Sequence, residues 1–209
     1  MRVFLSSSYS DVASLLPEVY REFRTGLTVT RIVLSHNCEA GKACGSNDQE
    51  VLLAQGFNID DLDITTSDQQ TIETVIERND ALFISGENAF LLLQEVQRTR
   101  ADQYISKHIR KGKLYIGVSA GAVITTPNIH YVLGINNPAK APLLSSFRAL
   151  NVIPFYPVPH VNQPPFTEKV ADIIRKYEHL LELIPIQNSE AIYYTGKRCT
   201  VVDSIEFPQ

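Results

Sequence analysis

The first two thirds of the chain alternate between short apolar, often β-branched runs and stretches with helical periodicity. The apolar runs, which we expect to form strands, cover 2–6, 27–34, 57–64, 81–85 and 113–118. Strands that are apolar along their whole length are buried on both faces, as in parallel sheets covered by helices. The alternation therefore predicts an α/β fold with a largely parallel sheet flanked by helices.

Helices are expected between these strands, at 11–24, 46–56, 89–97 and 101–110, with a further one opening at Ser67. The last third has a different pattern: 129–135 and 150–158 look extended, 167–180 looks helical, and 191–194 with 200–203 flank the turn 195–197 as a hairpin. Neither an internal repeat nor a long linker divides the chain, so we expect one domain over 1–209.

The composition excludes several classes of protein. Hydrophobic residues make up 44% and charged residues 20% of the 209 residues, which excludes a disordered chain. The formal net charge of −4 argues against electrostatic binding of nucleic acid. No apolar run approaches the roughly 18–20 residues that cross a bilayer, no signal peptide is visible, and three cysteines do not suggest a disulfide scaffold. We expect a reduced, cytoplasmic protein with neither a membrane nor a nucleic-acid partner.

The segment LYIGVSAGAVITT carries the most informative motif. Its core, GVSAG at 117–121, matches G-x-S-x-G between an expected strand and a helix-compatible stretch, the pattern of a nucleophile elbow. The sharp turn needs small neighbours, Gly117 and Gly121, and it presents Ser119 at the carboxyl end of the sheet, where open α/β folds bind ligands. The Ala120 N–H at the helix start is a candidate oxyanion donor. The alternative is a glycine-rich turn needed only for packing.

A serine hydroxyl needs a base to take its proton. The chain has five histidines: His36, His108, His130, His160 and His179. His108 and His179 lie in charged helical stretches and are expected to face solvent. His160 follows the apolar run 150–158 at a strand-to-loop boundary, where catalytic side chains are common. It is therefore preferred to His130, which remains the alternative.

A metal site is a weaker interpretation of the remaining histidine and cysteines. His36 lies near Cys38 and Cys44 in SHNCEAGKACG, but neither a fourth ligand nor a recognisable zinc spacing accompanies them. We therefore expect neither a metal ion nor an organic cofactor.

Three segments together resemble the peptidase E (aspartyl dipeptidase) family of serine peptidases, whose relatives include cyanophycinases. They are ISGENAFLLLQEV, GKLYIGVSAGAVITTPNI and ALNVIPFYPVPHVN, of which the SAGA elbow and the P-H-x-N segment are the most specific. The resemblance covers nearly the whole chain and implies a fold similar to class I glutamine amidotransferases. It also implies that Ser119 is the nucleophile and His160 the general base.

The sequence departs from the family pattern at two places. Where the family has a pair of glycines, one of which helps form the oxyanion hole, this chain has Gly86 and Glu87. A carboxylate at Glu87 would repel a developing oxyanion. The aspartate that orients the histidine in the family corresponds here to Asn136, and Glu190 is the alternative orienting residue.

The resemblance implies hydrolysis of short peptides by acyl transfer, with a preference for an N-terminal aspartyl residue. That preference requires a cation in the pocket, for which Lys140, Arg148 and Lys197 are candidates. Asn88 of the ISGENAF segment is a further candidate for substrate binding. We expect a small peptide as the partner and a monomer or homodimer as the assembly.

Two other functions remain open. With Glu87 and Asn136 both off pattern, the chain could be a silent family member that binds an acidic peptide or metabolite without cleaving it. It could also be an esterase or amidase that uses the same serine. A class I amidotransferase is disfavoured, because those enzymes have a cysteine at the elbow and this chain has Ser119.

Overall fold

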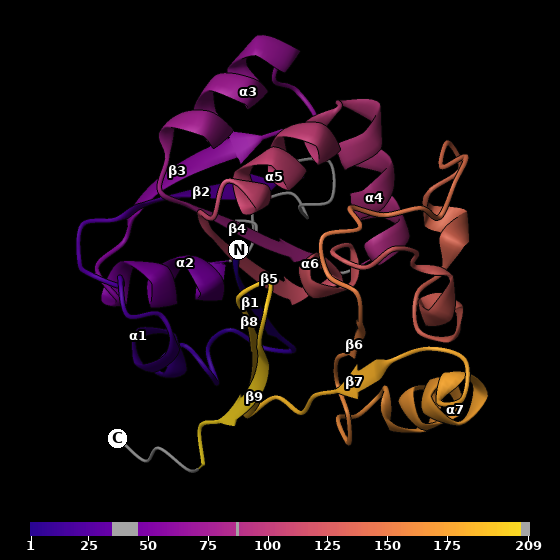
Figure 1. Ribbon diagram of the computed structural model, residues 1–209. Coiled ribbons are helices and arrows are strands. Elements are labelled where there is room, and N and C mark those ends of the chain that lie inside the picture. The colour runs from indigo at the N-terminus through magenta and orange to yellow at the C-terminus, as the bar shows by residue number, and fades with distance from the viewer. Residues whose placement is uncertain (35–45, 87, 206–209) are drawn as a thin grey trace.

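A computed structural model describes residues 1–34, 46–86 and 88–205 (Figure 1). Its strands are β1 (Arg2–Ser6), β2 (Thr28–Val33), β3 (Asn58–Asp63), β4 (Ala81–Gly86), β5 (Leu114–Ser119), β6 (Tyr156–Val158), β7 (Leu183–Pro185), β8 (Glu190–Tyr194) and β9 (Cys199–Asp203). Its α-helices are α1 (Leu15–Val19), α2 (Ser46–Ala54), α3 (Gln69–Arg78), α4 (Ala89–Arg98), α5 (Ala101–Arg110), α6 (Ala120–Val123) and α7 (Thr167–Tyr177). Two 3-10 helices are η2 (His130–Gly134) and η3 (Pro138–Lys140).

A seven-stranded sheet in the order β3-β2-β4-β5-β1-β8-β9 organises the fold, and β6 and β7 form a separate parallel pair. The first five strands are mutually parallel, whereas β8 is antiparallel to β1 and to β9. The predicted α/β fold with a largely parallel sheet is confirmed. Because β8 is reversed, its first residue lies at the edge of the sheet where β1, β4 and β5 end.

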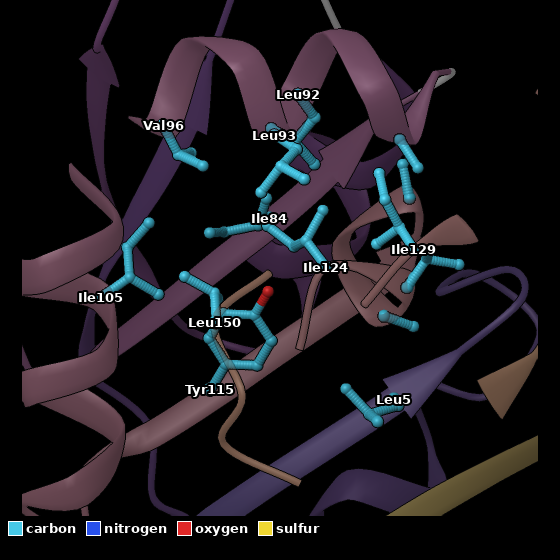
Figure 2. Close-up of a cluster of buried hydrophobic side chains, with 14 of the residues drawn as sticks. Leu5, Ile84, Leu92, Leu93, Val96, Ile105, Tyr115, Ile124, Ile129 and Leu150 are labelled. Atoms are coloured by element: carbon cyan, nitrogen blue, oxygen red, sulfur yellow. The ribbon is translucent and has the colours of Figure 1, made fainter. Parts of the chain in front are cut away.

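Helices cover both faces of the sheet, as expected from strands that are apolar throughout. Along β4, Leu82 and Ile84 belong to a buried cluster shared with α3, α4 and α5, whereas Ala81 and Phe83 belong to a second cluster shared with α1 and α2. Figure 2 shows Ile84 in the first cluster, close to Leu93 of α4. Alternate side chains of the same strand therefore stabilise opposite layers.

Three expected elements are wrong in extent or type. The helix expected over 11–24 is reduced to α1. A proline is tolerated in the first turn of a helix but clashes with a preceding turn, so a helix that contains Pro17 cannot begin much before Leu15. The run 129–135 is not extended: the Asn128 side chain accepts a hydrogen bond from His130 N at 2.7 Å, and this turn starts η2. The extended stretch expected over 150–158 shrinks to β6, and β7 was not expected.

The expectation that His108 faces solvent is also wrong. His108 belongs to α5, and its side chain is buried. Its Nδ1 atom is 3.1 Å from the Ile76 carbonyl oxygen, and its Nε2 atom is 3.1 Å from the Leu114 carbonyl oxygen. Burial lowers the pKa of His108 to about 4, so the ring is neutral near pH 7. The hydrophilic sequence around it reflects the outer face of α5, whereas His179 is exposed as expected.

The hairpin of β8 and β9 and the helix α5 lie where the sequence predicted them. Among the helices of the described ranges, none is long and apolar enough to cross a membrane.

Candidate active site

The sharp turn between β5 and α6 holds Ser119 in a strained backbone conformation. Ser119 has φ +52° and ψ −110°, in the left-handed half of the map that non-glycine residues rarely occupy. The side chain remains half-buried at the carboxyl edge of the sheet. This is the geometry of a nucleophile elbow, as the G-x-S-x-G motif predicted.

Close packing explains both glycines of the motif. A Cβ atom on Gly121 would lie 1.9 Å from the Ile84 carbonyl oxygen, and one on Gly117 would lie 2.7 Å from the Gly121 carbonyl oxygen. Any side chain at Gly121 would therefore push α6 away from β4. The Tyr115 hydroxyl donates a buried hydrogen bond of 2.7 Å to the Gly121 carbonyl and fixes the turn from the other side.

His160 lies directly against the serine. The Ser119 Oγ and His160 Nε2 atoms are 2.8 Å apart, within hydrogen-bond distance, although 41 residues separate them in sequence. The imidazole ring stacks on Phe166, with ring centroids 5.0 Å apart and an interplanar angle of 26°. His160, like Ser119, has a positive φ (+68°), so the surrounding contacts must hold its backbone.

Ser7, the residue after β1, supplies one such contact. Its buried hydroxyl accepts a hydrogen bond from His160 N at 3.0 Å and donates one to the Ile186 carbonyl at 3.1 Å. The same carbonyl accepts a hydrogen bond from Val161 N at 3.2 Å. Ser7 therefore joins the loop that carries His160 to the segment that follows β7.

Asn188 lies close enough to His160 to influence its protonation. It precedes β8, whose antiparallel direction brings it to the edge of the sheet that holds Ser119. Its side-chain oxygen is buried and has no hydrogen-bond partner among the described residues. Burial lowers the pKa of His160, and the hydrogen-bonding side chain of Asn188 partly opposes that shift by favouring the protonated ring.

The structure does not bring either expected orienting residue to the histidine. Asn136 lines a cleft beside Ser119 and His160. Its side-chain oxygen, however, accepts a hydrogen bond from Ala89 N at 2.9 Å and so attaches the loop after η2 to α4. Glu190 accepts a hydrogen bond from Gln187 N at 2.7 Å, which closes the turn before β8. Both positions have a structural role within the described chain.

The candidate oxyanion donors lie beside the serine. Ala120 follows Ser119 directly, and Gly86 is paired with Ser119 in the register of β4 and β5. Asn88 caps α4: its side-chain oxygen accepts hydrogen bonds from Phe90 N and Leu91 N, and its amide donates one to the Asn137 carbonyl at 3.0 Å. Glu87, and likewise His36, Cys38 and Cys44, lies outside the described residues.

None of the expected cations lines the cleft beside the serine. Lys140 and Arg148 are exposed, and Lys197 is in the turn between β8 and β9. That turn packs against Met1, at the opposite edge of the sheet from Ser119. His130 is exposed, and its Nδ1 is 3.3 Å from the Tyr177 hydroxyl. Within the described part of the chain, no group of three or more His, Cys, Asp or Glu residues is arranged to hold a metal ion.

Comparison with known proteins identifies the family. The model of peptidase family S51 matches residues 43–202, which is most of the chain and includes both the elbow and His160. The chain belongs to peptidase family S51. Membership of this family indicates a peptidase, and the resemblance to peptidase E seen in the sequence is confirmed.

Similar proteins agree with this assignment over almost the full length of the S51 chain. An uncharacterised peptidase of Listeria monocytogenes is 40% identical over 195 residues, covering 93% of this chain and 95% of that protein. One of Pasteurella multocida is 39% identical, covering 91% and 92%. A crystal structure of a peptidase E protein from Listeria monocytogenes has a TM-score of 0.87 at 37% identity, covering 97% of this chain and 98% of that one.

Two contacts of the S51 site were missed in the sequence. Ser7 follows a predicted strand end, as Ser119 does, so its position at the same edge of the sheet could be predicted. Its hydrogen bond with His160 in a distant loop could not. Asn188 belongs to no motif that the sequence analysis singled out. The predicted hairpin pairs β8 with β9 but does not give the direction of β8 relative to β1, and it is the antiparallel pairing with β1 that brings Asn188 to this edge.

Proposed function

We propose that this S51 peptidase is a serine peptidase that hydrolyses short peptides by acyl transfer, with Ser119 as nucleophile and His160 as general base. The observation that carries the proposal is the 2.8 Å distance between Ser119 Oγ and His160 Nε2 at a nucleophile elbow. We place this activity in the cytoplasm, acting on small peptides.

The proposed reaction uses one proton shuttle. His160 Nε2 takes the Ser119 hydroxyl proton as Oγ attacks the peptide carbonyl, and the resulting imidazolium returns the proton to the leaving amine. Water then attacks the acyl-enzyme, giving its proton to the same nitrogen, and the acid is released as Ser119 regains its proton. The lowered pKa of His160 supports the first step, because the ring is neutral and able to accept a proton near pH 7.

Backbone N–H groups are the proposed oxyanion donors. The Ala120 N–H is adjacent to the nucleophile, and Gly86 ends the neighbouring strand β4, where it is paired with Ser119. The pairing supports Gly86 most directly. We assign no role to the side chain of Glu87.

We assign the orienting role to Asn188 instead of Asn136. A buried carbonyl oxygen with no other partner is suited to accept the Nδ1–H of His160, which fixes the tautomer that leaves Nε2 free to act as base. An amide orients the ring as a carboxylate does, but it adds no charge to stabilise the imidazolium. We therefore expect slower turnover than from a site with a carboxylate.

A fluorophosphonate probe tests the activated serine without knowledge of the substrate. We expect stoichiometric labelling that disappears in Ser119→Ala and persists in Ser145→Ala, a matched change of an exposed serine. Absence of labelling in the folded protein would contradict the proposal and favour the silent binding protein. Comparison of alanyl dipeptides with p-nitrophenyl acetate then separates a peptidase from an esterase.

A further inference from the structure

The cleft beside the nucleophile is lined mainly by apolar side chains. Its walls come from α6, from η2 and the residues just after it, and from the loop that carries His160, and its cavity volume is about 30 Å³. The lining residues besides the proposed catalytic pair are Ala120, Val123, Val132, Ile135, Asn136, Pro159 and Phe166. Phe166, which stacks on the imidazole, forms the wall nearest the base.

Asn136 contributes the polar side chain of this lining besides the proposed catalytic pair, and its oxygen already accepts a hydrogen bond. The Asn136 side-chain oxygen accepts a hydrogen bond from Ala89 N, so the amide is held by α4. No lysine or arginine is among the described residues that line the cleft. A substrate carboxylate entering this space would therefore lose its water without gaining a cation from the described lining.

An aliphatic side chain, in contrast, would replace water against the valines, the isoleucine and the proline. In hydrophobic subsites, each methylene group changes specificity by about 10- to 200-fold. A leucine side chain is several carbon atoms larger than that of alanine, and unlike aspartate it carries no charge. The lining therefore favours the apolar side chain.

We propose that this cleft binds an apolar side chain of the substrate, so that the enzyme cleaves short peptides with an aliphatic residue next to the scissile bond rather than an aspartyl residue. This inference rests on the proposed Ser119–His160 chemistry, because it places the side chain beside those two residues. It departs from the aspartyl preference that the resemblance to peptidase E implied.

The first test measures kcat/KM for four dipeptides: Leu-Ala, Ala-Leu, Asp-Ala and Ala-Asp. We expect one of the leucine peptides to be the best substrate, and replacement of its leucine by aspartate to lower kcat/KM at least about 100-fold. Equal or faster cleavage of either aspartyl peptide would overturn the inference.

The second test adds a cation to the cleft. Ile135 is half-buried in the lining, so Ile135→Lys adds charge there without filling the core. Ile135→Lys should lower the ratio of kcat/KM for the best leucine peptide to kcat/KM for its aspartyl counterpart at least about tenfold. The matched control is Leu133→Lys, two residues away, where the side chain is 36% exposed and lies outside the lining. An unchanged ratio in Ile135→Lys, or the same change in both variants, would contradict the assignment of the cleft.

Labelling distinguishes failure of this inference from failure of the proposed function. If the fluorophosphonate labels Ser119 while the aspartyl peptides are preferred, the serine chemistry stands and the apolar cleft does not. If no label is taken up, calorimetric titration of the protein with Leu-Ala and Asp-Ala still tests the cleft, since tighter binding of Asp-Ala would overturn it.

Discussion

The two halves of the S51 site are built in different ways. The Ser119 half is local: one strand, one turn and one short helix, fixed by the contact of Gly121 with Ile84 and the hydrogen bond from Tyr115. The His160 half is assembled over long distances, by Ser7 at the end of β1, the segment after β7 and Asn188, two residues before β8.

The difference teaches where precision comes from in each half. The serine is positioned by backbone strain and steric contact, which tolerate almost no added volume. The histidine is positioned by individual hydrogen bonds, each of which can be removed while the others remain. Substitutions in the first half should therefore act in an all-or-none manner, and those in the second half by degrees.

Removal of the nucleophile should have the largest effect. Ser119→Ala should lower kcat/KM by about 10⁴-fold or more, because no other group can form the acyl-enzyme. The fold should be unchanged, since alanine carries a similar Cβ in the same backbone conformation. Hydrolysis assays and circular dichroism of the purified variant check both statements, and activity like that of the wild type would refute the nucleophile.

Crowding the elbow should cost stability as well as activity. Gly121→Ala would place a methyl group 1.9 Å from the Ile84 carbonyl oxygen, and it should lower the free energy of unfolding by about 3 kcal/mol. Gly134→Ala is the control, because its nearest contact would be an ordinary 3.8 Å to Ile173. Urea denaturation compares the two, and equal midpoints would mean that α6 shifts without resistance.

A charge at position 188 should speed the reaction. Asn188→Asp places a carboxylate beside the imidazolium formed during attack, so kcat should rise at least about tenfold and the pKa of His160 should increase. The matched Asn136→Asp should leave kcat nearly unchanged, because that side chain accepts a hydrogen bond from Ala89 N instead. Acceleration by Asn136→Asp alone would reverse the assignment.

Loss of the Ser7 hydroxyl should have a graded effect. Ser7→Ala removes the hydrogen bonds to His160 N and the Ile186 carbonyl, and we expect kcat to fall about tenfold with little change in KM. Ser7→Thr keeps the hydroxyl and should retain more activity. A fall in stability without a change in kcat would show that Ser7 acts on the fold and not on the histidine.

The smallest effect concerns pH. Because burial lowers the pKa of His160, the acidic fall of kcat/KM should have its midpoint below pH 6.5, with the base neutral and active above it. Phe166→Ala exposes the stacked ring to water and should move that midpoint upward. A pH–rate profile of both proteins measures the shift, and a downward movement would contradict the role of burial.

The same division explains how much the sequence could predict. The elbow was predictable because its determinants, from Gly117 to Gly121, lie within five adjacent residues. The parallel sheet was predictable because its strands are apolar on both faces. The position of Asn188 was not predictable, because it depends on the direction of β8. The hydrogen bond of Asn136 with Ala89 was not predictable either, because it depends on η2, a run that looked extended.

The hydrogen bonds of Ser7 link opposite parts of the chain, and this has a consequence during synthesis. A ribosome makes the chain from its N-terminus, so β1, the elbow and Ser119 exist long before Ile186 is added. Until then the Ser7 hydroxyl has no carbonyl partner from the segment after β7, and His160 lacks the segment that packs beside it. On the proposed mechanism, a nascent chain therefore carries its serine without an assembled base, and the capacity for hydrolysis would arise late in translation.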